Sequence, residues 1–125
     1  MAHRATRGTL FACSWGYDQT NVDYYVVTRA TPKMAYIAKV MSGDVQEIGD
    51  KLSGESWEVE VSKLYGDGSI RPDGLYKIHD GAIDGRDALR DIDSRYALWF
   101  APHEFANAYW WRGEEMYETP SGFGH

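Results

Sequence analysis

The stretch CSWGYDQTNVDYYVV, residues 13–27, ends in a run of aromatic and β-branched residues that predicts a β-strand. Successive side chains of a strand point to opposite faces. The two faces would be Tyr24, Val26 and Thr28 on one side and Asp23, Tyr25, Val27 and Arg29 on the other. Because both sets contain aromatic or branched residues, we expect this strand to be covered on both sides at one end.

Further strands are expected before and after this run. Thr31-Pro32-Lys33 predicts a turn, because proline fixes φ and has no N–H to donate, and residues 34–40 then return as the second arm of a hairpin. The other expected strands begin at Leu10 or cover residues 57–62, 75–79, 96–100, 105–111 and 114–119. We expect roughly six or seven of these runs to form strands, which predicts a mainly β fold, a small antiparallel barrel or sandwich of which an SH3-like barrel is one form.

One short helix is expected, near residues 84–96, where apolar residues recur at helical spacing. The glycine-rich segment SGDVQEIGDKLSGES, residues 42–56, is predicted to be a loop with at most one helical turn, and residues 65–74 are predicted to be rich in turns. No repeat or composition shift divides the chain. We therefore expect a single domain of all 125 residues, with mobile residues at 1–8 and 120–125.

The composition narrows the classes of function. A net charge of −6 argues against sequence-independent nucleic-acid binding, which needs a concentrated positive surface. Cys13 is the only cysteine, so an internal disulfide and a thiolate zinc site are excluded. The start of the sequence does not resemble a signal peptide, and no run of about eighteen apolar residues occurs. We expect a soluble cytoplasmic protein that does not enter a membrane.

Polar residues between the aromatic residues of the opening stretch suggest a ligand site, because flat rings stack on a base while amides recognise its edges. The predicted ligand-binding residues are Trp15, Tyr17, Gln19, Thr20, Asn21, Asp23 and Tyr25. The alternative is a structural role, in which Thr20, Asn21 and Asp23 hydrogen-bond their own backbone in a turn. Such turns beside core aromatic residues are common, so the sequence is compatible with a ligand site and with a structural turn.

Consecutive tryptophans predict an interface. Trp110 and Trp111 would point to opposite faces of a strand, so one ring should lie in the core and the other under a helix or at the surface. An exposed tryptophan would mark a surface for a protein partner, because tryptophan is enriched at binding hot spots.

No constellation of residues indicates catalysis. Phosphate loops, nucleophile elbows and paired-cysteine motifs do not occur in the sequence, and Cys13 beside aromatic residues is typical of a small core residue. Asp80, Asp84, Gly85 and Asp91 occupy positions of a calcium-binding loop, but an alanine and a final aspartate remove two ligand oxygens. We expect no catalytic residue, no metal and no cofactor.

The run W15-G-Y-D-Q-T-N-V-D-Y-Y-V-V27 resembles the signature S-W-G-Y-[DE]-Q-T-N-x-D-[FY]-[FY] of a family of small uncharacterised proteins of phages and other bacterial mobile elements. W111-R-G-E-E-M-Y-E-T119 and G124-H125 resemble the ending of that family, with Glu115 in place of a proline, whereas residues 42–92 depart from it. The resemblance implies an accessory protein that acts in the cytoplasm of a bacterial host. It implies no particular activity.

Three classes of function follow from these observations. The first is a non-enzymatic accessory protein that binds a host protein or a small nucleotide-like ligand through the polar and aromatic patch. The second is an acidic DNA mimic that inhibits a host enzyme, suggested by the net charge of −6. The third is a single-strand nucleic-acid binder that stacks bases on aromatic rings, which the net charge does not favour.

Overall fold

The computed structural model describes residues 2–16, 20–54, 63–68, 70–82 and 93–116. Within these ranges the protein is mainly β, and seven strands form one sheet in which every pairing is antiparallel. The strands are β1 (Leu10–Trp15), β2 (Asn21–Ala30), β3 (Met34–Val40), β4 (Ile70–Lys77), β5 (His79–Asp80), β6 (Leu98–Phe100) and β7 (Ala108–Trp111). The expected fold class is confirmed.

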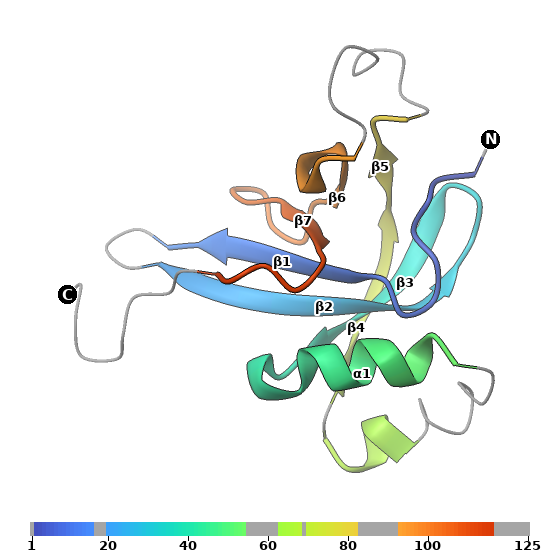
Figure 1. Ribbon diagram of the computed structural model, residues 1–125, viewed down its shortest axis with the longest axis vertical. Helices are drawn as coiled ribbons and strands as arrows, with labels where there is room; N and C mark the ends of the chain where they lie inside the picture. Colours follow the sequence, from blue (N-terminus) through green and yellow to red (C-terminus); the bar gives the residue numbers. More distant parts are fainter. Residues whose placement is uncertain (1, 17–19, 55–62, 69, 83–92, 117–125) are drawn as a thin grey trace.

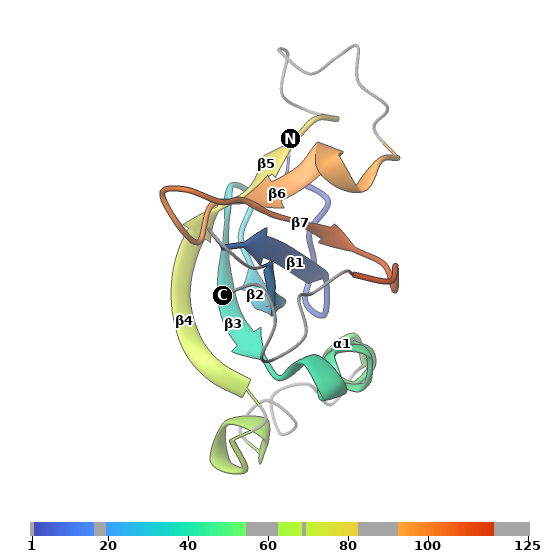
Figure 2. The same cartoon turned by 90° about the vertical axis from the view of Figure 1, so that its left-hand side faces the viewer.

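The two edges of the sheet belong to one stretch of chain. The strand order is β4-β3-β2-β1-β7-β6-β5, so β4 and β5 stand at opposite ends although only Ile78 separates them in sequence. This stretch pairs with β3 in its first part and with β6 in its last part. The sheet therefore curls into an open barrel or sandwich that its strand pairings do not close (Figures 1 and 2).

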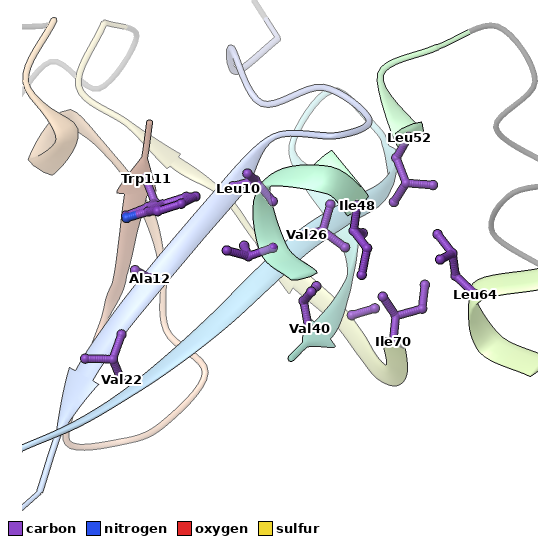
Figure 3. Packing of buried hydrophobic residues seen from close by; sticks show 12 residues of the cluster. Leu10, Ala12, Val22, Val26, Val40, Ile48, Leu52, Leu64, Ile70 and Trp111 are labelled. Carbon is purple, nitrogen blue, oxygen red and sulfur yellow. The ribbon is translucent and has the colours of Figure 1, made fainter. Parts of the chain in front are cut away.

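Both faces of β2 are buried over residues 25–28, as the alternation in the sequence predicts. The first face packs beneath α1 (Val45–Leu52) in a cluster that we call the helix-side core, shown in Figure 3. Its residues are Leu10, Ala12, Val22, Val26, Ala38, Val40, Val45, Ile48, Leu52, Leu64, Ile70 and Trp111. The second face lies inside the curled sheet, in the inner core. Its residues are Ala5, Phe11, Cys13, Tyr25, Val27, Ala35, Ile37, Ile78, Leu98, Phe100 and Ala108.

The helix α1 corrects the prediction of a loop over residues 42–56. After the short 3-10 helix η1 (Ser42–Asp44), residues Val45, Ile48 and Leu52 recur at helical spacing and are buried on one face. Gly49 lies on that same face, where a Cβ atom would come within 2.7 Å of Leu10 Cδ1. The glycine that suggested a loop instead lets the helix approach β1 closely.

Other predicted elements differ from the structure in detail. The turn-rich segment 65–74 contains the first half of β4, which accommodates its proline and glycine through a register shift opposite β3. Residues 114–116 form no strand, and β7 pairs with β1 and β6 instead. The predicted strand at 57–62 lies outside the described residues. Most of the predicted helix at 84–96 does too, and its end forms a 3-10 turn, η3 (Arg95–Ala97).

The beginning of the chain is packed against the sheet, in contrast to the expected mobile segment 1–8. His3 and Ala5 are buried, and His3 Nε2 lies 2.9 Å from the carbonyl oxygen of Met34. The Arg4 guanidinium forms an ion pair with Asp80, whose side chain is fully buried, at 2.9 Å. Residues 120–125 lie outside the described residues. In the described part of the chain, no helix has the length and apolar character needed to cross a membrane.

Candidate binding site

The ends of β1 and β2 bring together two of the predicted site residues. Trp15 and Asp23 lie on neighbouring strands, with Trp15 opposite Asn21 and Cys13 opposite Asp23. The Trp15 indole Nε1 donates a hydrogen bond to Asp23 Oδ2 at 2.8 Å. Lys39 of β3 lies on the other side of the carboxylate, with its Nζ 3.3 Å from Asp23 Oδ1. Asp23 thus ties three strands together at one end of the inner core.

The loop before β7 adds two further rings. His103 and Phe105 stack on each other, with centroids 4.9 Å apart and planes 5° apart. Their centroids lie 6.0 Å and 6.3 Å from that of Trp15, respectively. The His103 Nε2 atom lies 4.0 Å from Asp23 Oδ2. We call Trp15, Asp23, Lys39, His103 and Phe105 the Trp15 site.

The Trp15 site combines an exposed apolar ring with charged groups. Phe105 is 73% exposed, the highest value among the large hydrophobic residues that are exposed in the described ranges. The Lys39 side chain is 47% exposed, whereas that of Asp23 is 16% exposed. Phe105 packs near Trp15, whose indole is bonded to the same carboxylate as Lys39, so the site combines apolar contact area with a cation.

The cysteine beside this site lies in the inner core. Cys13 is completely buried, and burial together with the negative charge of Asp23 raises the pKa of its thiol to about 11. The thiol is therefore protonated at neutral pH, and only the thiolate is strongly nucleophilic. Its burial agrees with the prediction of a small core residue.

The remaining predicted ligand-binding residues divide into three groups. Tyr25 is 2% exposed in the inner core and packs edge-to-face on Phe100, so its ring is not presented at the surface. Thr20 and Asn21 are half-buried where β2 begins. Tyr17 and Gln19 lie outside the described residues.

The two predicted interface tryptophans occupy different environments. Trp111 is 9% exposed in the helix-side core, and its indole nitrogen donates to the Glu114 carbonyl at 2.7 Å. Trp110 is half-buried, with the Arg112 and Arg4 guanidinium carbons 4.4 Å and 5.6 Å from its ring centroid. Trp111 is therefore a core residue, and Trp110 is partly covered by cations.

Sequence reasoning did not find three residues of the Trp15 site. Lys39 follows the hairpin alternation and could have been placed on the same face as Tyr25. No local pattern points to His103 and Phe105, because they lie about ninety residues beyond Trp15 and reach it only through the return of the chain into β7.

Neither a metal site in the described residues nor a similar protein indicates the function. In the part of the chain that the structure describes, no three histidine, cysteine or acidic side chains are grouped to hold a metal ion. Of the calcium-loop pattern, Asp80 is bound by Arg4, and residues 84, 85 and 91 lie outside the described residues. Comparisons with protein-family models, curated proteins and solved structures found no match.

Proposed function

We propose that this protein is a non-enzymatic accessory protein of a phage or other mobile element, which binds a host protein at the Trp15 site in the bacterial cytoplasm. The observation that carries the proposal is the exposed Phe105 ring, stacked on His103 and held beside Trp15. Aromatic residues at the centre of an interface supply much of its binding energy. The signature in residues 15–27 supports the phage origin.

The size of the neighbouring cavity favours a protein over a nucleotide-like ligand. Lys39 also lines a cavity of about 130 Å³ with Val40, Met41 and Arg71. Sites for small organic ligands usually measure roughly 300–1,000 Å³. A side chain of a protein partner fits so small a cavity, whereas a nucleotide does not. The exposed Lys39 and Arg71 favour a partner with acidic side chains at this position.

The test is capture of host proteins with a matched pair of variants. The Phe105→Ala variant removes the exposed ring, and Tyr36→Ala removes another ring that is 44% exposed on a different part of the sheet. After capture from bacterial lysate, the bound protein is purified and its affinity measured. We expect Phe105→Ala to weaken binding by roughly thirtyfold, as for a hot-spot residue, and Tyr36→Ala to leave it within about twofold.

The result that would overturn the proposal is equal affinity of the wild type and Phe105→Ala. Thermal unfolding of both variants accompanies the measurement. A variant that binds weakly but melts at the wild-type temperature has lost contact area and not its fold.

A second candidate is the stacking of single-stranded nucleic acid on the strands β5, β6 and β7. His79 stacks on Trp99 with centroids 3.9 Å apart, and Trp99 pairs across the strands with Tyr109. Tyr96 packs on Tyr109 at 4.9 Å and has the Arg95 guanidinium over its ring. This candidate predicts oligonucleotide binding that weakens steeply with salt and is lost in Trp99→Ala. Salt-independent binding, or no binding at low salt, would exclude it.

One residue counts against the alternative of a DNA mimic, whereas residues 83–92 of the acidic segment lie outside the described residues. A mimic needs rows of exposed carboxylates, and Asp80 at the start of the acidic segment 80–93 is fully buried against Arg4.

A further inference from the structure

A second cavity lies at the end of β1 and β2 opposite to the Trp15 site. Its volume is about 450 Å³, within the range of small-molecule sites. Its lining residues are Thr6, Arg7, Thr28, Arg29, Ala30 and Ser53. Two of these residues are arginines, three carry hydroxyl groups and none is acidic. On a chain with a net charge of −6, this lining is locally positive.

Three segments fix the walls of the cavity. The loop before β1 is joined to β2 by two hydrogen bonds, from the Gly8 amide to the Val27 carbonyl at 2.8 Å and from the Val27 amide to the Thr9 carbonyl at 2.9 Å. A register shift between Val27 and Arg29 makes a bulge at Thr28. The third wall is the C-terminal end of α1, which the loop approaches closely (Figure 1).

Arg7 is held in place by the carbonyl groups at the end of α1. Its Nε donates to the Leu52 carbonyl at 2.7 Å, and its Nη2 donates to the Gly54 carbonyl at 2.9 Å. The guanidinium charge therefore offsets the partial negative charge at the helix C-terminus. This neutralisation removes a repulsion that an anion entering the cavity would otherwise meet.

Arg29 is the side chain best placed to bind an anion. It is exposed at the end of β2, and within the described ranges no carboxylate forms an ion pair with it. The Thr28 and Ser53 hydroxyls donate to the carbonyls of Tyr36 and Gly49, so the arginines are the main donors. A guanidinium group binds a phosphate through two parallel hydrogen bonds.

We propose that this cavity binds a phosphate group, with Arg29 as its principal ligand and Arg7 as the fixed second cation. The volume exceeds what a phosphate ion occupies, which leaves space for an organic part of a phosphorylated small molecule. The site is separate from the Trp15 site, so either proposal can fail without the other.

Isothermal titration calorimetry with four probes tests the proposal: inorganic phosphate, ribose 5-phosphate, adenosine 5′-monophosphate and uncharged adenosine. We expect saturable binding of the phosphorylated probes and none of adenosine. Equal affinities for inorganic phosphate and the two esters would support a site for the free anion, and tighter binding of an ester would support a phosphorylated metabolite. Binding of adenosine as tight as that of its monophosphate, or no saturable binding of any phosphate probe, would overturn the proposal.

Variants then locate the site. Arg29→Gln should weaken binding at least about tenfold, because hydrogen bonds to a charged group are lost. Lys77→Gln is the control, since it removes an exposed cation from β4 that lines neither cavity and should change the affinity less than about twofold. Phe105→Ala should bind the probes like the wild type. Unchanged affinity in Arg29→Gln would refute the assignment of the site.

Discussion

The ion pair between Arg4 and Asp80 connects the beginning of the chain to the far edge of the sheet. Asp80 is completely buried and accepts hydrogen bonds from the Arg4 amide at 2.8 Å, from Arg4 Nη2 at 2.9 Å and from the Ala82 amide at 2.9 Å. In Asp80→Asn the negative charge is lost and one acceptor oxygen becomes an NH₂ donor. The Arg4 cation then faces a neutral group that can accept at only one atom.

The size of the loss follows from the burial of the two partners. Removing one partner of a fully buried ion pair costs about 3–5 kcal/mol of unfolding free energy. The Arg4 side chain is 32% exposed and can regain some hydration, so we expect the lower end of this range, about 3 kcal/mol. In a domain of this size that lowers the melting temperature by roughly 10 °C.

Urea unfolding at pH 7 measures the loss, with Glu47→Gln as the control. Glu47 and Lys51 form an exposed ion pair on α1 at 3.3 Å, and neutralising it should cost less than about 0.5 kcal/mol. A loss below about 1 kcal/mol in Asp80→Asn would refute the argument that this pair holds the beginning of the chain to the sheet.

The ion pair between Arg4 and Asp80 also makes the stability of the protein depend on pH. Burial alone would raise the pKa of Asp80, but hydrogen bonds from Arg4 and the Ala82 amide, with the Arg4 charge, outweigh it and hold the pKa below its ordinary value. A carboxyl whose pKa is lower in the folded state stabilises the protein above its unfolded pKa, about 3.9, and this contribution disappears as the pH falls through the folded pKa. The stability gap between wild type and Asp80→Asn should therefore narrow below about pH 4, and a constant gap would contradict this reasoning.

Two further predictions test the packing around α1 and the inner core. Gly8 has a φ of +92°, and a Cβ there would overlap Ser53 Oγ, so Gly8→Ala should cost about 2 kcal/mol or more. Gly43→Ala, where no atom lies within 4 Å of the added Cβ, should stay within about 0.5 kcal/mol, and equal melting temperatures of the two variants would contradict the close approach. Cys13, with a thiol pKa of about 11, should react with a disulfide reagent at pH 8 only after the protein is unfolded, and rapid labelling of the native protein would show that the thiol is accessible.

The parts of the fold that depend on residues close together in sequence could be predicted. The alternation in β2 fixed which side chains face each core, and the proline turn joined β2 to β3 as expected. The helix α1 was missed although Val45, Ile48 and Leu52 recur at helical spacing, because Gly49 counts against a helix in isolation. The missing side chain of Gly49 favours the fold only because Leu10 of β1 packs against that position, and this contact exists only in the tertiary structure.

The packed beginning of the chain was missed for a similar reason. Residues 1–8 are mostly polar, and polar ends are usually unpacked unless a partner holds them. Here the partner is Asp80, which lies seventy-six residues away from Arg4 in sequence. A charged pair at that separation leaves no periodic signal, and the same aspartate suggested a calcium loop when considered with its sequence neighbours alone.

In the stretch after Cys13, the Asp23 side chain has a structural role in the described part of the chain. The Asp23 carboxylate accepts the indole N–H of Trp15 and pairs with Lys39, so its oxygens are used in joining strands. The ring that the proposed function assigns to partner binding is Phe105, which that stretch does not contain. Substitution of Asp23 would therefore disturb strand contacts and binding together, because it removes the hydrogen bond that orients the Trp15 ring. Substitution of Phe105 removes an exposed ring and little of the core, which makes Phe105 the residue at which binding can be tested separately from folding.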